Sequence, residues 1–369
     1  MNDYAGDGGN TNLTRTYAPS KFNHASAIAP LRGGTIVAFY SGIAECHDSQ
    51  RVWLFYNDRG GKTYDPIHLE GLTGNPVFLP WHGRVKIIYS KFEKLVDRRV
   101  EWWQHCSLWE REVDFDPKTG EIKTSEPQPL NSPLGEGYLP RCNPIVSSDG
   151  YLLPLYREEK PYNFYGTILH SYDGISWAHQ GDIGVPDPDS ADKPGEPTPV
   201  PCIQPTLWQS GDVTHSLLRN FTRYGKRYAL HSTSKDNGKT WSKPTNSAFY
   251  NANNSILAIE CPDKDRRKKQ VLVVWNDDIS GRNNITLGTI DGLTIARLDR
   301  YGSYPAACVD GDKLHITWTA MANKLKFPYA KSVIKHVEYD LNSVIRYASS
   351  NWGLGQAPKR GEVDELYQT

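Results

Sequence analysis

The chain has 369 residues, with 42 Lys and Arg against 42 Asp and Glu, so its formal net charge is zero. A neutral chain lacks the broad positive surface on which binding to nucleic acids or anionic membranes depends, and we expect neither partner. Its 11 Trp, 21 Tyr, 31 Gly and 25 Pro exclude a disordered protein, which would lack aromatic residues, and a helical bundle, which would lack turn formers.

The sequence also predicts a soluble chain. No run of apolar residues approaches the length of roughly 18 that membrane insertion requires. Residues 1–13 are polar and contain none of the basic and apolar regions of a signal peptide, so secreted and cytoplasmic locations both fit. The six cysteines form no C-x-x-C pair, which predicts buried thiols and no structural zinc site. We expect no cofactor and no metal.

Short runs rich in β-branched and aromatic residues predict strands along the whole chain. In chain order they include residues 35–40, 52–56, 85–89, 151–156, 271–275 and 314–318. Turns that contain Gly and Asp separate these runs. The pattern therefore favours an all-β fold.

One turn motif recurs between the predicted strands. Segment 234–241 reads Ser-Lys-Asp-Asn-Gly-Lys-Thr-Trp, in which Asp and Asn make local hydrogen bonds and Gly takes a positive φ. Related turns are marked by Asp residues that lie 58, 57, 63 and 55 residues apart, namely Asp58, Asp116, Asp173, Asp236 and Asp291. Such a period indicates a stacked or radial architecture. Unrelated hairpins in a β-sandwich would be the alternative.

Three or four short strands per repeat are typical of a β-propeller blade. The length of the chain accommodates about six such repeats. The sequence therefore predicts a six-bladed β-propeller of four-stranded antiparallel blades. We expect a single propeller over residues 14–348, closed around residues 339–342 with an N-terminal strand, between a flexible segment 1–13 and a C-terminal tail 349–369.

The turn at Asp236 resembles the Asp box of sialidases and related proteins with bacterial neuraminidase repeats, which are six-bladed propellers. The resemblance extends over residues 14–345 and is strengthened by the segments between the turns. These segments resemble those of a divergent, sialidase-like branch of the family. They are His-Ala-Ser at 24–26, Gly-Asn-Pro-Val at 74–77, Arg-Cys-Asn-Pro at 141–144 and Ile-Gln-Pro at 203–205.

The resemblance also implies a set of site residues. Asp48, in an acidic loop after the first predicted strand, matches the general acid of sialidases. Tyr304 matches the nucleophilic tyrosine. Arg219 and Arg282 match two of the three arginines that bind the sugar carboxylate.

Two positions depart from the sialidase pattern. Asn23 or His24 stands where the first arginine would be, which weakens a three-arginine clamp on a carboxylate. Gln204 stands where a glutamate would accept the proton of the nucleophile, and without that base a tyrosine with a pKa near 10 is a poor nucleophile. The sequence therefore predicts an activity other than that of an ordinary sialidase.

Polar residues at matching positions of the blades should meet at one end of a propeller's axis. Besides the residues above, this argument selects a further set for the pocket: Glu45, His47, Asn75, Arg141 and Glu158. A carboxyl group with a raised pKa can protonate a glycosidic oxygen, so Glu45 or Glu158 would complete a carboxylate pair with Asp48. His24 and His47 would act as bases or as hydrogen-bonding partners of a sugar.

The leading hypothesis is an exo-glycosidase that cleaves a bond to an acidic or deoxy sugar in a glycan substrate. Asp48 would be the general acid, and Tyr304 a nucleophile or orienting group. Three alternatives stay open: a polysaccharide lyase in which His24 or His47 acts with Tyr304 on a uronate, a non-catalytic glycan-binding propeller, and a protein-interaction scaffold. The sequence gives no indication of the sugar, the linkage or the oligomeric state.

Overall fold

The computed structural model describes residues 14–92, 102–159, 163–185, 201–221, 228–250, 254–263, 268–278, 281–321 and 331–350. These ranges consist almost entirely of antiparallel β-sheets, so the predicted all-β class is confirmed. The segment 1–13, expected to be flexible, and residues 351–369 of the expected tail lie outside the described residues. Within the described ranges, no helix is both long and apolar enough to cross a membrane.

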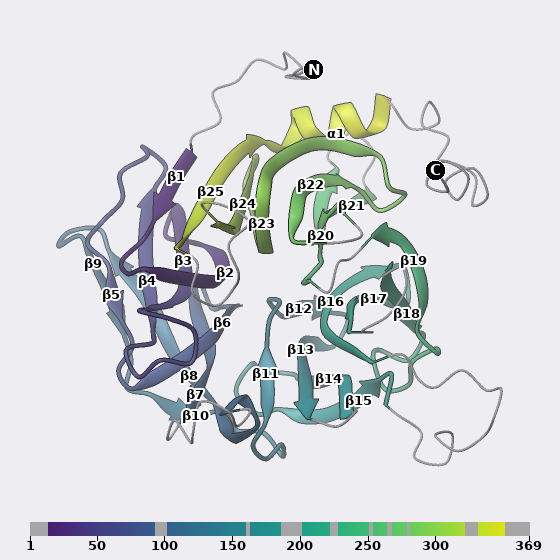
Figure 1. Ribbon diagram of the computed structural model, residues 1–369, viewed down its shortest axis with the longest axis horizontal. Helices are drawn as coiled ribbons and strands as arrows, with labels where there is room; N and C mark the ends of the chain where they lie inside the picture. The colour runs from purple at the N-terminus through teal and green to yellow at the C-terminus, as the bar shows by residue number, and fades with distance from the viewer. Residues whose placement is uncertain are drawn as a thin grey trace.

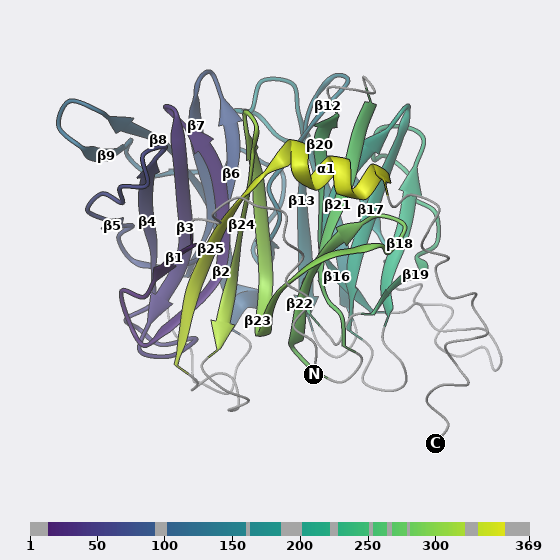
Figure 2. The same ribbon diagram turned by 90° about the horizontal axis from the view of Figure 1, so that it is seen from above.

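The sheets are arranged in a ring around a central axis, as in a propeller (Figure 1). Figure 2 shows the same sheets from above, with their strands roughly aligned with one another and neighbouring strands antiparallel. Inner strands of neighbouring sheets contact one another: β2 (Phe22–Leu31) contacts both β6 (Leu72–Trp81) and β23 (Thr294–Asp310), and β16 (Cys202–Ser210) contacts β20 (Leu257–Asp263). Residues far apart in the sequence therefore meet along the axis.

Two of the sheets have four strands each, in the order of the chain. The first consists of β2 (Phe22–Leu31), β3 (Gly34–Gly42), β4 (Arg51–Asp58) and β5 (Ile67–His68). The second consists of β16 (Cys202–Ser210), β17 (Val213–Asn220), β18 (Tyr228–Ser234) and β19 (Thr245–Tyr250). Both match the predicted four-stranded blade.

Two further sheets have five strands. One contains β6 (Leu72–Trp81), β7 (Arg84–Phe92), β8 (Cys106–Asp116), β9 (Glu121–Thr124) and β10 (Gln128–Pro129), with the 3-10 helix η1 (Trp102–His105) before β8. The other contains β11 (Tyr138–Pro140), β12 (Ile145–Ser147), β13 (Gly150–Glu159), β14 (Asn163–Ser171) and β15 (Ala178–Ile183). In the latter, β11 and β12 both pair with β13, so residues 141–144 interrupt the inner strand.

The last sheet has seven strands and corrects the prediction of separate four-stranded sheets. It contains β20 (Leu257–Asp263), β21 (Lys268–Asn276), β22 (Asn283–Thr289), β23 (Thr294–Asp310), β24 (Lys313–Met321), β25 (Ser332–Asp340) and β1 (Thr14–Tyr17). The strand β23 runs through 17 residues without a break: its first half pairs with β22 and its second half with β24. Hydrogen bonding is therefore continuous, and the described strands form five sheets.

The ends of the described chain meet in this sheet. The N-terminal strand β1 pairs with β25, as expected for a ring closed by an N-terminal strand. The helix α1 (Leu341–Ser350), which the sequence analysis did not predict, follows β25 directly. Its first turn is capped by Asp340, whose Oδ1 accepts a hydrogen bond from the Ser343 amide at 2.7 Å.

The recurrent Asp turns all join the third and fourth strands of a four-strand unit. In the most complete one, the Asp236 carboxylate accepts the Thr240 amide at 2.8 Å, and the Trp241 indole donates to the Gly238 carbonyl at 2.9 Å. Gly238 has φ +88°, a value that glycine adopts without strain. The repeat predicted from spacing is therefore a repeat of one hairpin.

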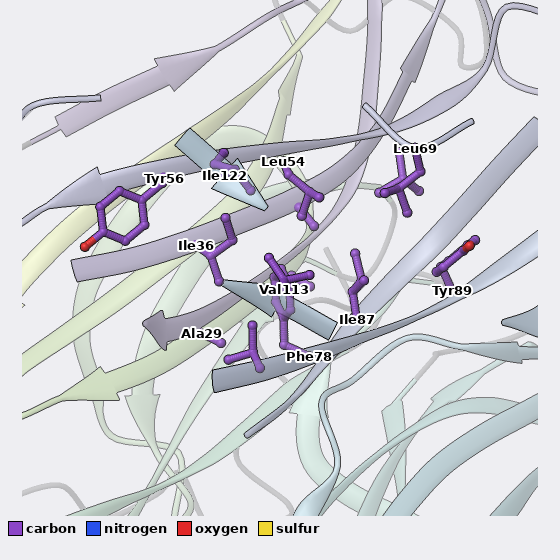
Figure 3. Packing of buried hydrophobic residues seen from close by; sticks show 14 of the residues in the cluster. Ala29, Ile36, Leu54, Tyr56, Leu69, Phe78, Ile87, Tyr89, Val113 and Ile122 are labelled. Atoms are coloured by element: carbon purple, nitrogen blue, oxygen red, sulfur yellow. The ribbon is translucent and has the colours of Figure 1, made fainter. Parts of the chain in front are cut away.

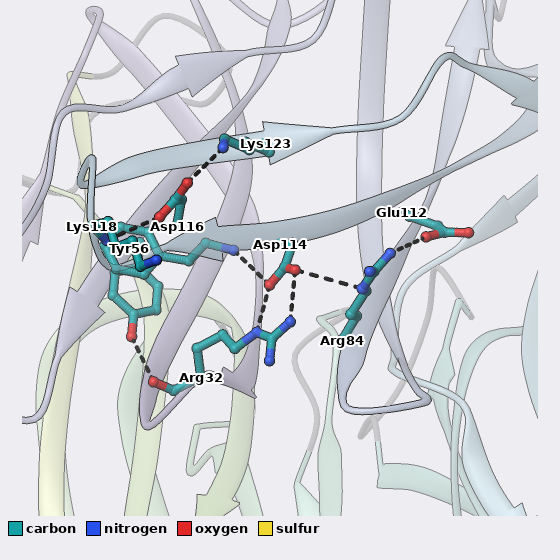
Figure 4. Close-up of polar contacts among 9 residues, drawn as sticks. Arg32, Tyr56, Arg84, Glu112, Asp114, Asp116, Lys118 and Lys123 are labelled. Carbon is teal, nitrogen blue, oxygen red and sulfur yellow. Dashed lines mark hydrogen bonds and ion pairs between the residues drawn. The ribbon is translucent and has the colours of Figure 1, made fainter.

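Apolar side chains fill the wedges between adjacent sheets. Between the first two sheets, Tyr56 stacks on Phe115 with ring centroids 3.6 Å apart. Figure 3 shows Tyr56 among other buried residues of this cluster. At the rim of the same wedge, Arg32 pairs with Asp114, and Arg84 bridges Asp114 to Glu112 (Figure 4). Such exposed pairs contribute less than about 1 kcal/mol each, so the wedge is held mainly by its apolar contacts.

Candidate active site

Four inner strands share one local irregularity. In β2, β6, β16 and β23 the pairing register shifts, and each shift contains a non-glycine residue with positive φ. These residues are Ala25 (φ 53°), Asn75 (φ 47°), Gln204 (φ 56°) and Tyr304 (φ 55°). A β-bulge re-aims a side chain, and a strained backbone of this kind costs of order 1–3 kcal/mol per residue. Four such bulges at equivalent positions indicate a site.

The four bulged residues line one pocket of about 190 Å³. Polar and aromatic side chains form most of its wall, and the complete lining is Ala25, Tyr40, Glu45, Asn75, Phe92, Trp103, Leu139, Tyr156, Glu158, Gln204, Arg219, Phe221, Arg282 and Tyr304. Every sheet of the ring contributes to this set. The pocket therefore exists only when the ring is closed.

Tyr304 is the centre of the cationic side of the pocket. Its hydroxyl oxygen accepts hydrogen bonds from Arg219 Nη1 at 3.0 Å and from Arg282 Nη2 at 3.4 Å. The Arg282 guanidinium also lies 5.0 Å from the centre of the Tyr304 ring. Burial raises the pKa of Tyr304, but the charges of Arg219 and Arg282 outweigh burial, so the pKa lies below its usual value of 10.0. The two arginines therefore make Tyr304 easier to ionise than a free tyrosine.

Glu45 lines the same pocket as Tyr304, and its pKa is shifted in the opposite direction. Burial raises the pKa of its carboxyl group to about 7, against the lowering effect of the Tyr40 hydroxyl and of Arg282. The Tyr40 hydroxyl donates to Glu45 Oε1 at 2.9 Å. A carboxyl group with such a pKa is protonated in about half of the molecules at neutral pH, so Glu45 can act as an acid or as a base.

His24 packs beneath the pocket. Its ring centroid lies 4.2 Å from that of Tyr304, and the side chain is buried. Burial lowers the pKa of His24 well below 6.5, and Arg282, Arg141 and Arg219 lower it further. The imidazole is therefore neutral at physiological pH and does not compete with the arginines for an anion.

Gln204 and Asn75 orient the groups around them. Gln204 Oε1 accepts a hydrogen bond from Arg219 Nη1 at 3.3 Å. Its Nε2 donates to the Tyr156 hydroxyl at 3.5 Å, and Asn75 Nδ2 donates to the same hydroxyl at 3.3 Å. The amide at position 204 thus holds Arg219 in place, a task that needs no ionisable group.

The structure brings together seven of the eleven residues that the sequence analysis selected. Seven line the pocket: Tyr304, Glu45, Arg219, Arg282, Gln204, Asn75 and Glu158. His24 supports Tyr304 from below, outside the lining. Asp48, His47 and Arg141 lie elsewhere.

Asp48 and His47 need a correction. The Asp48 side chain is 80% exposed and pairs with His47 Nδ1 at 2.7 Å, away from the pocket lining. The cause is local: Cys46 has φ 60°, so the chain turns between Glu45 and His47, and His47 and Asp48 lie outside the pocket lining that contains Glu45. The pocket carboxyl group of this loop is therefore Glu45. The predicted role of Asp48 as the acid in the pocket does not fit its position.

Arg141 also lies outside the pocket lining, although it was expected to bind substrate. It is 3% exposed and donates to the backbone carbonyls of Ser26 at 3.2 Å and Pro305 at 2.8 Å. Its guanidinium lies under the Tyr304 ring, 5.2 Å from the centroid. It cannot reach a molecule in the pocket without leaving these contacts.

Sequence reasoning missed the aromatic part of the wall. Tyr40, Phe92 and Tyr156 lie near the ends of the second strands β3, β7 and β13, and Trp103 and Phe221 complete this side. Tyr40 and Tyr156 were recognised only as the last residues of predicted strands. Their matching positions in successive repeats were the signal that they face the axis.

Comparisons with known proteins agree with this architecture. Residues 138–316 match the BNR repeat-like domain. No curated protein matches the chain. Among the described residues, no group of three or more His, Cys, Asp or Glu is arranged to hold a metal ion.

Several solved sialidases superpose on most of this chain. Trypanosoma rangeli sialidase in complex with the inhibitor DANA has a TM-score of 0.70 at 13% identity, over 90% of this chain and 57% of its own. The same enzyme in complex with sialic acid gives 0.67 at 15%, over 89% and 56%. A Hadza microbial sialidase gives 0.67 at 12%, over 88% and 66%.

The fold is a β-propeller with the architecture of these solved sialidases, and residues 138–316 resemble a BNR repeat-like domain, so the predicted resemblance is confirmed at this level. At identities of 12–15% the solved sialidases show a shared fold with this chain and no more. The chain spans only 57% of the length of the DANA-bound sialidase.

Proposed function

We propose that this protein is a sialidase-like glycoside hydrolase that releases a terminal acidic sugar from a glycan. One observation carries the proposal: the Tyr304 hydroxyl is held by two arginines in a pocket that also contains Glu45, a carboxyl group with a pKa of about 7. A nucleophile whose anionic form is stabilised and an acid with a pKa near neutral pH are the two groups that a retaining glycosidase needs.

Two features of the pocket support an acidic, terminal sugar. Arg219 and Arg282 present guanidinium groups, which bind carboxylates through strong charge-assisted hydrogen bonds. The volume of about 190 Å³ is below the roughly 300–1,000 Å³ of pockets for drug-sized ligands. The pocket therefore suits one sugar unit, with the rest of the glycan outside.

The proposed reaction has two steps. In the first, the Tyr304 phenolate oxygen attacks the anomeric carbon while the Glu45 carboxyl group gives its proton to the leaving oxygen, which departs as an alcohol. In the second, the Glu45 carboxylate takes a proton from water, whose oxygen attacks the same carbon and displaces Tyr304 as a phenolate. Two inversions give net retention of configuration.

This scheme accounts for the glutamine at position 204. A glutamate partner would take the proton of the nucleophile, and Gln204 cannot do so. Here the charges of Arg219 and Arg282 lower the pKa of Tyr304 instead. The active form holds Tyr304 ionised and Glu45 protonated, so only a part of the molecules is active at a given pH.

We also propose that residues 14–348 form a single propeller with six blades. The seven-stranded sheet contains two sets of four strands, β20 to β23 and β23 to β25 with β1, which share β23. The spacing of the Asp turns supports this division. An experimental density map that resolves the individual strands tests the number of blades, and a ring of four or five blades would contradict the proposal.

The function is tested with a panel of fluorogenic aryl glycosides of sialic acids, hexuronic acids and neutral sugars. We expect cleavage of an acidic member, with Tyr304→Phe and Glu45→Gln each lowering kcat by about 100-fold or more. Asp48→Asn, on the same loop as Glu45 but outside the pocket, is the matched control and should retain the wild-type kcat within about threefold.

The same panel separates the alternatives, because each leaves different products. A lyase would release an unsaturated sugar that absorbs in the near ultraviolet, and glycans containing uronates are included for this reason. A glycan-binding protein would bind members of the panel without cleaving any of them. Either result, or full activity of Glu45→Gln, would overturn the proposed hydrolase.

A further inference from the structure

Arg141 occupies an unusual position for a charged side chain. It comes from the segment 141–144 that interrupts the inner strand between β11 and β12, and its guanidinium is buried near the axis. Its two hydrogen bonds go to the carbonyls of Ser26 and Pro305, while its Nε has no hydrogen-bond partner among the described residues. Burying a charge with incomplete hydrogen bonding is costly, so a specific role is expected.

The two carbonyls that Arg141 binds are not arbitrary. Ser26 and Pro305 directly follow Ala25 and Tyr304, two of the bulged residues with positive φ. One guanidinium therefore ties together equivalent bulges of two neighbouring inner strands, β2 and β23. The backbone conformation that aims Tyr304 into the pocket is fixed at its next peptide by this hydrogen bond of 2.8 Å.

The charge of Arg141 also acts on the Tyr304 ring. Its guanidinium lies 5.2 Å from the ring centroid, close to the 5.0 Å of Arg282. The groups whose negative form stabilises the Arg141 cation are Cys142 and three tyrosines, Tyr304, Tyr156 and Tyr40. Of these three tyrosines, only Tyr304 has a pKa below its usual value. An ionised Tyr304 places a negative charge beside the buried Arg141 cation, whose guanidinium lies 5.2 Å from its ring centroid.

We propose that Arg141 is a positioning residue for Tyr304. Arg141 holds the bulge that aims the Tyr304 hydroxyl into the pocket, and its charge stabilises the ionised form of the phenol. Its importance for catalysis rests on the proposed function, in which Tyr304 is the nucleophile. The substrate does not touch Arg141. Three arginines then surround one tyrosine, two at the hydroxyl and one beneath the ring.

The same segment offers a matched control. Asn143 Nδ2 donates to the Ile28 carbonyl at 2.9 Å, and its Oδ1 accepts the Phe78 amide at 2.9 Å. Asn143 therefore ties β2 to β6 with two hydrogen bonds, as Arg141 ties β2 to β23. It carries no charge, and it has no contact with Tyr304 among the interactions described. Asn143→Ala reports the effect of losing a cross-strand tie alone.

The experiment compares Arg141→Met, Arg141→Lys and Asn143→Ala in the full chain. The ionisation of Tyr304 is followed by NMR of protein labelled with ¹³C at the tyrosine ζ carbons, with the signal assigned by its loss in Tyr304→Phe. The same variants are assayed for kcat and KM across pH with the acidic glycoside that the wild type cleaves. Thermal unfolding reports stability.

We expect Arg141→Met to raise the pKa of Tyr304 and to lower kcat at least tenfold, with KM changed less than about threefold. Arg141→Lys keeps the charge but replaces the two nitrogens that bind the Ser26 and Pro305 carbonyls by a single one, so the pKa should stay near that of the wild type while kcat falls. Asn143→Ala should lower the melting temperature and leave the pKa of Tyr304 unchanged. Should Arg141→Met not fold, kcat of Arg141→Lys is compared with that of Asn143→Ala, and equal values refute the proposal.

An unchanged pKa of Tyr304 in Arg141→Met, or an equal shift in Asn143→Ala, would overturn the role of Arg141 even if the protein cleaves glycosides. If the pKa responds as expected but no glycoside is cleaved, the proposed hydrolase fails while the effect of Arg141 on Tyr304 stands. The NMR titration needs no substrate, so the two failures are distinguishable.

Discussion

Replacing Glu45 by Gln should remove activity and at the same time stabilise the protein at alkaline pH. In the unfolded chain a glutamate ionises near pH 4.5, whereas burial keeps Glu45 of the folded protein protonated up to about pH 7. Between these values the unfolded state has already lost a proton that the folded state retains, so rising pH favours unfolding. The shift from 4.5 to about 7 corresponds to up to about 3 kcal/mol of stability that is present below pH 4.5 and lost above pH 7.

Glutamine has no charge to bury, and it can still accept the hydrogen bond from Tyr40. Glu45→Gln should therefore recover this free energy at pH 8.5 but not at pH 4.5. With the entropy of unfolding expected for 369 residues, 3 kcal/mol raises the melting temperature by about 4 °C. Differential scanning calorimetry at both pH values measures the difference, with Asp48→Asn as the exposed control on the same loop. An equal effect of Glu45→Gln at the two pH values would refute the reasoning.

Three further outcomes are expected. Arg219→Met should weaken binding of a sugar carboxylate by about 10- to 100-fold, because one charge-assisted hydrogen bond is worth about 1.5–3 kcal/mol. Calorimetric titration with an acidic sugar measures the affinity, and an unchanged affinity would show that the carboxylate binds elsewhere. The pH profile of kcat/KM should be bell-shaped, with an acidic limb near pH 7 from Glu45 and an alkaline limb below pH 10 from Tyr304; an optimum below pH 6 would contradict both assignments. Burial lowers the pKa of His336 well below 6.5, so its contribution to stability is present above pH 6.5 and lost as pH falls. The Tyr17 hydroxyl in β1 bonds His336 Nδ1 at 3.0 Å, so the protection factors of the β1 amides, corrected for the intrinsic pH dependence of exchange, should fall from pH 7.5 to 5, and constant protection factors over this range would disprove it.

The repeat could be predicted from the sequence because the hydrogen bonds that form each Asp turn are local to that turn. The Asp236 carboxylate binds amides within its own turn, and the same residue types recur wherever that hairpin recurs. The continuity of β23 was not readable, because nothing near Tyr301 and Gly302 distinguishes a strand that changes partners from a loop between two strands. The first half of β23 pairs with the strand before it, β22, and the second half with the strand after it, β24, so the single unbroken strand follows from how two adjacent hairpins pack side by side and not from a local sequence pattern.

The site was predictable where the backbone irregularity leaves a trace. Asn75, Gln204 and Tyr304 each precede a proline within an inner strand, an arrangement that points to a bulge, since proline is rare in regular central strands. The choice between Glu45 and Asp48 left no such trace. It depends on the left-handed conformation of Cys46, a residue type that gives no indication of positive φ.

The four bulges have an evolutionary consequence. A bulged residue lies outside the regular hydrogen-bonded pairing of its strand, so replacing its side chain disturbs few of the contacts that define the sheet. Four positions on different sheets thus line one cavity, and the side chain at each can change independently of the others: Ala25, Asn75, Gln204 and Tyr304. New pocket chemistry can be acquired by changing one position at a time, and Ala25, with the smallest side chain of the four, leaves the most room for such a change.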